Sequence, residues 1–91
     1  MKKINELRKK IDRLDKKLVL NLKKRLIISK KISKIKEKEG INNFDPKREE
    51  TIIQEILKIY SKENISKEIT KFMKSILKIS KDYQKRKIKS I

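Results

Sequence analysis

The sequence predicts an all-α fold built from three helices of very unequal length. Residues 1–38 contain no glycine and no proline, and their apolar residues recur at spacings of three and four, as on one face of a helix. Two further segments, 46–60 and 67–86, carry the same spacing, and no segment has the alternating pattern of a strand. We expect one domain over residues 1–91, because no linker divides the chain.

The first helix, expected over about residues 3–38, is too long for one small chain to cover. At about 1.5 Å per residue it spans roughly 54 Å, whereas a compact chain of 91 residues is only about 30 Å across. Either this helix projects as a coiled coil, or a second copy of the chain lies along it. We expect the second arrangement, an obligate homodimer whose apolar core is shared between the chains.

The apolar stripe of this helix is interrupted at Asn21 and Arg25. A polar side chain on a buried stripe costs free energy unless a partner satisfies it. These two residues either set the register of a coiled coil, with the head of Arg25 reaching water, or mark a polar site. The apolar residues of the stripe are Ile4, Leu7, Ile11, Leu14, Leu18, Ile28, Ile32 and Ile35.

Glycine, proline and short polar residues set the boundaries of the elements. Gly40, the only glycine, suits a left-handed cap at the end of the first helix. Asp45 and Pro46 fit an N-cap followed by the first residue of the second helix, and Ser66 is expected to cap the third. The residues expected to face inward are Ile52, Ile53, Ile56, Leu57 and Tyr60 on the second helix, and Ile69, Phe72, Met73, Ile76, Leu77, Ile79 and Tyr83 on the third.

The chain is strongly basic, with 29 Lys and Arg residues against 12 acidic residues and a net charge of +17. Such a charge suits nucleic acid, an anionic membrane surface or a small anionic ligand. Pairs of lysines recur every seven residues along the first helix, which keeps them on its outer face. This even spread favours an ordinary solvated surface over a binding patch.

The absence of cysteine and histidine excludes several kinds of chemistry. Disulfides, thiolate nucleophiles, Cys/His zinc sites and imidazole acid-base catalysis are all ruled out. The sequence also has no apolar run of membrane-spanning length and no apolar block typical of a signal peptide, so we expect a cytoplasmic protein.

Each predicted helix carries polar residues where core residues belong. They are Arg25, Ser29 and Lys36 on the first helix, Arg48 and Glu49 at the start of the second, and Ser80 and Gln84 on the third. One such group would be an ordinary satisfied core residue. Polar groups on the inner faces of all three helices predict a shared polar cavity.

The arginines indicate what such a cavity binds. The chain uses lysine almost everywhere and has only five arginines, of which three are Arg8, Arg25 and Arg48. The planar guanidinium fork matches a carboxylate with two parallel hydrogen bonds, which a lysine cannot do. The ligand indicated is a small molecule with more than one carboxylate.

The ordered segments LRKKIDRLDKKLVLNLKKR, ISKKISKIK, FDPKREE and ILKISKDYQ resemble the all-helical chorismate mutases along essentially the whole chain. The resemblance implies an intertwined homodimer of three helices per chain with two equivalent active sites. The residues that stand where the active-site residues of the family would fall are Arg8, Arg25, Lys36, Asp45, Arg48, Glu49, Ser80 and Gln84. Two positions depart from the family pattern: Ser33, where relatives often have glycine, and Asn21, where they usually have an apolar residue.

The activity implied by the resemblance is the Claisen rearrangement of chorismate to prephenate, in phenylalanine and tyrosine biosynthesis. This one-step reaction needs no nucleophile, general base, metal or cofactor, which suits a chain without histidine or cysteine. The enzyme holds the reactive conformer and stabilises charge on the breaking ether oxygen. The resemblance implies that Lys36, Gln84, Arg25 and Glu49 are catalytic, with Lys36 and Gln84 donating hydrogen bonds to that oxygen.

The resemblance also assigns substrate contacts. Arg25 and Arg48 bind carboxylates, while Arg8 reaches in from the other subunit. Ser80 contacts a carboxylate as well. Glu49 holds the ring hydroxyl of the substrate, with help from the backbone of Asp45.

Two other functions remain open at this point. A related family on the same fold removes pyruvate from isochorismate with a similar set of Arg and Lys. A basic helical module that binds nucleic acid would explain the charge, but the chain has only two Tyr and two Phe for stacking on bases. We expect no nucleic acid or membrane partner.

Overall fold

The computed structural model describes residues 1–86 and consists of three helices in that range: α1 (Lys2–Glu39), α2 (Pro46–Ile59) and α3 (Ser66–Lys85). No strand occurs in this part of the chain, so the predicted all-α class is confirmed. Every helix end lies within one residue of the predicted position: α1 is one residue longer at each end, α2 ends one residue earlier, and α3 begins and ends one residue earlier.

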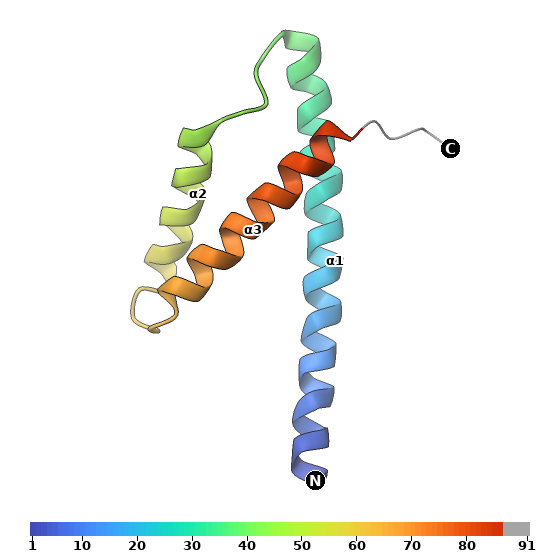
Figure 1. The fold of residues 1–91 in the computed structure, drawn as a ribbon, viewed down its shortest axis with the longest axis vertical. Coiled ribbons are helices and arrows are strands. Elements are labelled where there is room, and N and C mark those ends of the chain that lie inside the picture. Colours follow the sequence, from blue (N-terminus) through green and yellow to red (C-terminus); the bar gives the residue numbers. More distant parts are fainter. Residues whose placement is uncertain (87–91) are drawn as a thin grey trace, which may run out of the picture.

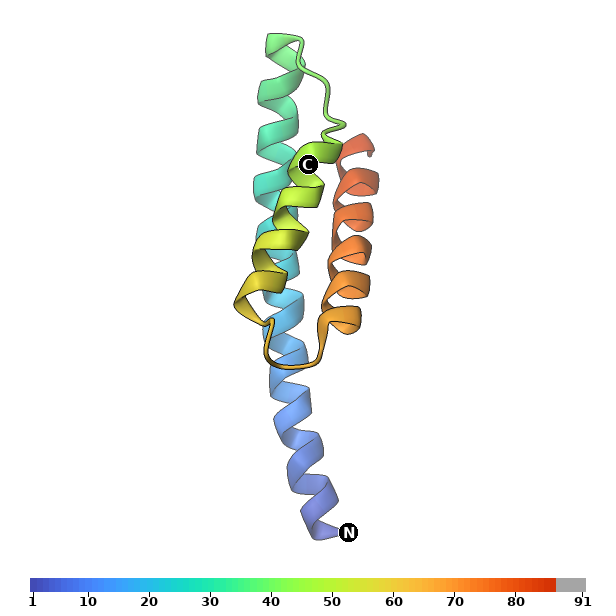
Figure 2. The ribbon, with the colours of Figure 1, turned by 90° about the vertical axis from the view of Figure 1, so that its left-hand side faces the viewer.

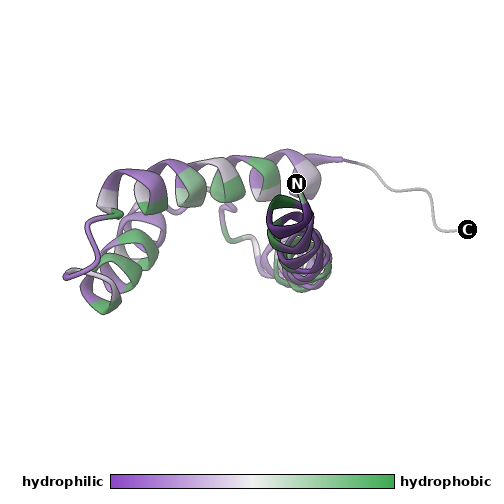
Figure 3. Ribbon diagram, turned by 90° about the horizontal axis from the view of Figure 1, so that it is seen from below, coloured by the Kyte–Doolittle hydropathy of each residue, from purple (hydrophilic) through white to green (hydrophobic). Residues whose placement is uncertain are grey.

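The three helices do not form a compact bundle, because α3 alone joins the other two. Figures 1 and 2 show α3 running back along α2 as a helical hairpin and crossing α1 in its C-terminal half. Seen along α1, helices α1 and α2 lie on the same side of α3 (Figure 3). The described chain measures 56 × 38 × 15 Å, and the N-terminal half of α1 extends beyond both other helices.

The end of α1 is fixed by Gly40, as predicted. Its φ of 67° lies in the left-handed region, which glycine adopts without strain. The Gly40 N–H donates to the carbonyl of Glu37 at 3.3 Å, and the Ile41 N–H donates to the carbonyl of Lys36 at 2.8 Å. These two bonds form a Schellman motif, which satisfies carbonyls at the helix end and turns the chain toward α2.

The start of α2 also follows the prediction, whereas the start of α3 does not. The Asp45 carboxylate accepts a hydrogen bond from the backbone N–H of Arg48 at 3.1 Å, and Pro46 is the first helical residue. The predicted Ser66 cap is wrong: Ile65 occupies the N-cap position, and no side chain caps α3. Asn64 turns the chain with φ 53°, and the helix begins at Ser66 itself. Ser66 is therefore the first helical residue rather than the residue before it, and its hydroxyl does not cap the helix.

The apolar core lies between α2 and α3. Ile53, Met73 and Leu77 are buried, and further apolar residues pack against them. Three residues expected to face inward are instead exposed in the single chain: Tyr60 by 40%, Phe72 by 50% and Ile79 by 42%. Tyr60 follows the last turn of α2, while Phe72 and Ile79 share a face of α3 that neither α1 nor α2 covers. The apolar stripe of α3 is therefore wider than its contact with α2.

The apolar stripe of α1 is likewise uncovered. Its N-terminal residues keep between 45% and 58% of their surface exposed; they are Ile4, Leu7, Ile11, Leu14 and Leu18. Within residues 1–86, no helix combines the length and the apolar character needed to cross a membrane.

Candidate active site

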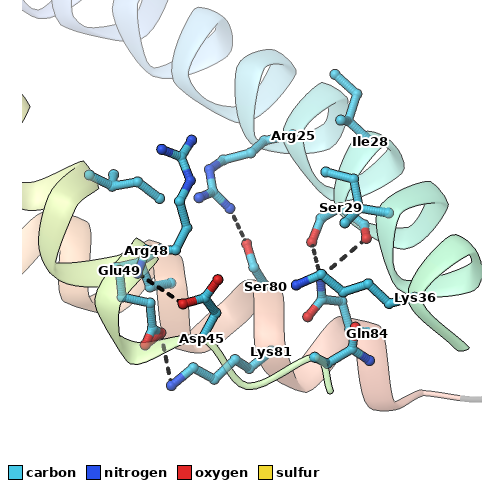
Figure 4. Close-up of a pocket in the computed structure, with 14 residues that line it drawn as sticks. Arg25, Ile28, Ser29, Lys36, Asp45, Arg48, Glu49, Ser80, Lys81 and Gln84 are labelled. Carbon is cyan, nitrogen blue, oxygen red and sulfur yellow. Dashed lines mark hydrogen bonds and ion pairs between the residues drawn. The ribbon is translucent and has the colours of Figure 1, made fainter. Parts of the chain in front are cut away.

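A cavity of about 270 Å³ opens where the C-terminal half of α1, the start of α2 and the end of α3 meet (Figure 4). Seven of the eight residues predicted for the site line this cavity: Arg25, Lys36, Asp45, Arg48, Glu49, Ser80 and Gln84. The eighth, Arg8, does not line it, because it lies exposed on the N-terminal half of α1.

Arg25 enters the cavity from α1 and is tied to α3. Its Nη1 donates a hydrogen bond to the Ser80 hydroxyl, and Ser80 is buried with only 5% of its surface exposed. Partial burial, and secondarily the positive charge of Arg48, lower the pKa of Arg25 from its ordinary value. Two guanidinium groups thus share one wall of the cavity, where an anion would relieve their repulsion (Figure 4).

Gln84 reaches back from α3 to α1. Its Nε2 donates to the Ser29 hydroxyl at 2.7 Å and to the Ser29 carbonyl at 3.1 Å. Lys30, the next residue of α1, donates from Nζ to the backbone carbonyls of Gln84 at 2.9 Å and Arg86 at 2.7 Å. The Gln84 amide and the half-buried Lys36 side chain lie at the other end of the cavity from the two arginines (Figure 4).

The start of α2 supplies the acidic residues of the cavity. Asp45 uses its carboxylate to cap the helix, as described above. Glu49 forms an ion pair with Lys81 of α3, with 2.8 Å between Oε1 and Nζ. The Lys81 ammonium also lies 5.0 Å from the centre of the Phe44 ring, a distance at which a cation interacts with an aromatic face.

The charges of the cavity do not balance. Four cationic side chains line it, Arg25, Lys36, Arg48 and Lys81, against the carboxylates of Asp45 and Glu49. Across residues 1–86 only Lys81 has a carboxylate within 4.0 Å, which leaves the other three cations to be matched by a ligand. The arrangement therefore fits a small anion with several oxygen atoms.

A sequence model of the family described as chorismate mutase type II matches residues 7–85. The chain belongs to this family.

Individual relatives agree with this assignment to the type II chorismate mutases. A chorismate mutase of Methanocaldococcus jannaschii is 33% identical over 86 residues, which cover 93% of this chain and 87% of that protein. A bifunctional chorismate mutase/prephenate dehydratase of Aquifex aeolicus is 37% identical over 59 residues, 65% of this chain. That match covers only 16% of the bifunctional enzyme. No solved structure matches the chain significantly.

Three polar residues of the cavity were given no contact with a ligand by the sequence analysis of this chorismate mutase family member: Ser29, Lys81 and Asn43. Ser29 was predicted to face the polar cavity together with Arg25, but its bond to Gln84 was not predicted. Lys81 follows Leu77 by four residues and precedes Gln84 by three, a helical spacing that could have revealed it. Asn43 lies in a loop without periodicity, and it donates to the Ser33 hydroxyl at 2.9 Å.

Proposed function

We propose that the protein is an isomerase, a chorismate mutase that rearranges chorismate to prephenate. The observation that carries this proposal is the set of three cations, Arg25, Lys36 and Arg48, that line one cavity without a carboxylate partner in residues 1–86. Chorismate is a dianion with two carboxylates, so it supplies the charge that the cavity lacks. Membership of the type II chorismate mutase family supports the same reaction.

Substrate binding is proposed to begin at the arginine wall. Arg25 and Arg48 each take a carboxylate of chorismate through the guanidinium fork, and Ser80 adds a hydroxyl beside Arg25. Arg25 and Arg48 repel one another in the free protein. A bound carboxylate reduces this repulsion, which adds to the binding free energy that its hydrogen bonds supply.

Catalysis is proposed to take place at the opposite end of the cavity. As the ether C–O bond breaks, negative charge grows on the ether oxygen, and Lys36 and Gln84 donate hydrogen bonds to it. A positive ammonium group stabilises this developing charge more than it stabilises the neutral ether, so it lowers the barrier rather than only tightening binding. The reaction requires no metal and no cofactor.

The ring hydroxyl of chorismate is assigned to Glu49, together with the backbone of Asp45. The ion pair with Lys81 involves Oε1 of Glu49, and a carboxylate has enough lone pairs to accept a hydroxyl hydrogen as well. This contact orients the ring without taking part in bond breaking.

The active form is proposed to be an intertwined homodimer. The uncovered stripe on the N-terminal half of α1 carries five large apolar residues that are each about half exposed, and burying the exposed half of each is worth about 1 kcal/mol. A second copy packed along this stripe would bring Arg8, which directly follows Leu7 of the stripe, to the cavity of the partner. Arg8 then completes the substrate-binding set in trans.

The test of the proposed function is the loss of chorismate absorbance on adding purified protein, with products identified by chromatography. Formation of prephenate, abolished by Lys36→Ala, is the expected result. Pyruvate released from isochorismate, without prephenate, would instead identify a lyase on the same fold. Inertness toward both substrates, with salt-sensitive binding of DNA, would identify a basic nucleic-acid-binding protein. A cytoplasmic location, the expectation stated from the sequence, is part of the same proposal.

A further inference from the structure

The contact between Ser29 and Gln84 joins two helices at the edge of the cavity. Ser29 is buried, with 8% of its surface exposed, and its hydroxyl accepts from the Gln84 amide at 2.7 Å. A hydroxyl on a helix often bonds to a carbonyl of its own helix, whereas this one accepts from a side chain 55 residues away. The contact therefore fixes the Gln84 amide as well as satisfying Ser29.

The acceptor on α1 decides which end of the Gln84 amide faces that helix. A carbonyl oxygen only accepts hydrogen bonds, so the Ser29 carbonyl at 3.1 Å is compatible with the amide nitrogen and not with the amide oxygen. The nitrogen carries two hydrogens. If the shorter bond to the hydroxyl is kept, the second hydrogen can leave the longer bond and turn to an oxygen in the cavity.

Lys30 holds the backbone of the same residue. Its ammonium group bridges the carbonyls of Gln84 and Arg86, which belong to the last turn of α3 and its cap. Carbonyls at a helix C-terminus lack partners and carry partial negative charge, so a cation is favoured there. Neighbouring residues of α1 thus hold both the side chain and the backbone of Gln84.

We propose that Ser29 is a positioning residue, which holds one N–H of the Gln84 amide so that the other N–H is presented beside Lys36 to the breaking bond of the substrate. This inference rests on the proposed function, because it assigns Ser29 a role only through Gln84. Ser29 itself donates nothing to the reacting atoms. Its hydroxyl holds the amide in place by accepting one N–H, while its backbone carbonyl, which only accepts, keeps the amide nitrogen rather than the oxygen on the side facing α1.

A double-mutant cycle tests this role, with kcat and KM for chorismate measured for the wild-type protein, Ser29→Ala, Gln84→Ala and the double variant. Ser29→Ala should lower kcat by about tenfold, the size of one lost hydrogen bond, while KM changes less than about twofold. In the Gln84→Ala background, Ser29→Ala should have no further effect on kcat, because the amide that it positions is absent.

Ser33→Ala is the matched control. Ser33 is also buried on α1, one turn from Ser29, and its hydroxyl also accepts from a side-chain amide, that of Asn43. Any loss of kcat in Ser33→Ala should be the same with Gln84 present or replaced, since Ser33 does not contact Gln84. Thermal unfolding of both serine variants, followed by circular dichroism, separates a loss of fold from a loss of positioning.

The outcomes separate the inference from the proposed function. Wild-type protein that does not convert chorismate overturns both, before any variant is compared. If the wild-type protein is active, equal losses from Ser29→Ala in the two backgrounds, or no loss at all, overturn the positioning role alone. If Ser29→Ala unfolds, hydrogen exchange of the Gln84 side-chain amide in the wild-type protein decides the matter: rapid exchange contradicts the contact, and slow exchange supports it.

Discussion

Helix α3 has two contacts of opposite character. Toward α2 it presents Met73 and Leu77, which are buried with Ile53 in an apolar core. Toward α1, one to two turns further along, it presents Ser80 and Gln84, which are hydrogen-bonded to Arg25 and Ser29. The apolar contact supplies folding free energy through burial, while the polar contact contributes little net stability but fixes donors around the cavity.

The difference shows that one helix can carry the residues that stabilise the fold and the residues that line the cavity on separate parts of its length. A substitution on the α2 side should change the free energy of unfolding and leave turnover intact. A substitution on the α1 side should do the reverse. Four experiments test this division, beginning with the greatest expected effect on turnover.

Lys36→Ala should lower kcat by about 10²–10³-fold, because it removes a charged donor from the developing oxyanion. Its thermal unfolding should match that of the wild-type protein, since no carboxylate within residues 1–86 pairs with Lys36. Lys38→Ala is the control, because Lys38 is an exposed lysine in the same last turn of α1. Loss of turnover in both variants would point to the overall charge of the chain rather than to the cavity.

Gln84→Glu should make turnover depend on pH, whereas the wild-type amide does not titrate. A carboxyl group donates a hydrogen bond only when protonated, and its ordinary pKa is about 4.3. As the pH rises above this value the group ionises and repels the developing oxyanion, so kcat should be about tenfold or more lower at neutral pH than near pH 5. The pH profile of kcat for both proteins checks this, and parallel profiles would remove Gln84 from the reacting atoms.

Mixed dimers test whether the apolar stripe of α1 brings a residue to the cavity of a second copy. Arg8→Ala and Lys36→Ala homodimers should each be nearly inactive. A random mixture should regain about a quarter of wild-type activity, because half of the dimers are mixed and each mixed dimer has one intact site. Mixed dimers verified by affinity tags that regain nothing would contradict a site shared between subunits.

Met73→Ala should have the smallest effect on turnover and a large effect on stability. Met73 is buried in the core between α2 and α3 and does not line the cavity. Its truncation should lower the free energy of unfolding by about 2–4 kcal/mol, measured with urea, with kcat of the folded fraction unchanged. Lys74→Ala, at the exposed neighbouring position, should leave both quantities near the wild-type values.

Features set by local chemistry could be predicted from the sequence. Gly40 and Asp45 end and begin helices because of their own backbone and side-chain preferences, and both boundaries are confirmed. The Ser66 cap failed because the turn at Asn64, which no periodicity reveals, started the helix early. A helix boundary could therefore be predicted when the residue that sets it lies at the boundary itself, as Gly40 and Asp45 do.

Features set by packing between helices were only partly predictable. The spacing of apolar residues correctly predicted that Met73 and Leu77 belong to the core between α2 and α3. It did not predict that Phe72, on the same helix, lies outside that core and is half exposed. The cavity residues Lys36 and Gln84 were predicted from their polar character on inner helix faces, the resemblance added their roles, and the structure brings them to one cavity. Lys81 was missed because, although its helical spacing from Leu77 and Gln84 suits a cavity residue, a lysine is common everywhere in this chain, and only its ion pair with Glu49 sets it apart.

The turn at Gly40, near the cavity, requires a left-handed backbone conformation. A side-chain carbon added at this glycine would meet no atom within 4 Å, so space does not restrict the position, and only the sign of φ does. The carbonyl that receives the last bond of this turn belongs to Lys36. A mirror-image alanine at position 40 would therefore suit the turn, while the natural form would strain it and disturb the lysine beside the substrate. The geometry of this end of the cavity depends on an achiral residue.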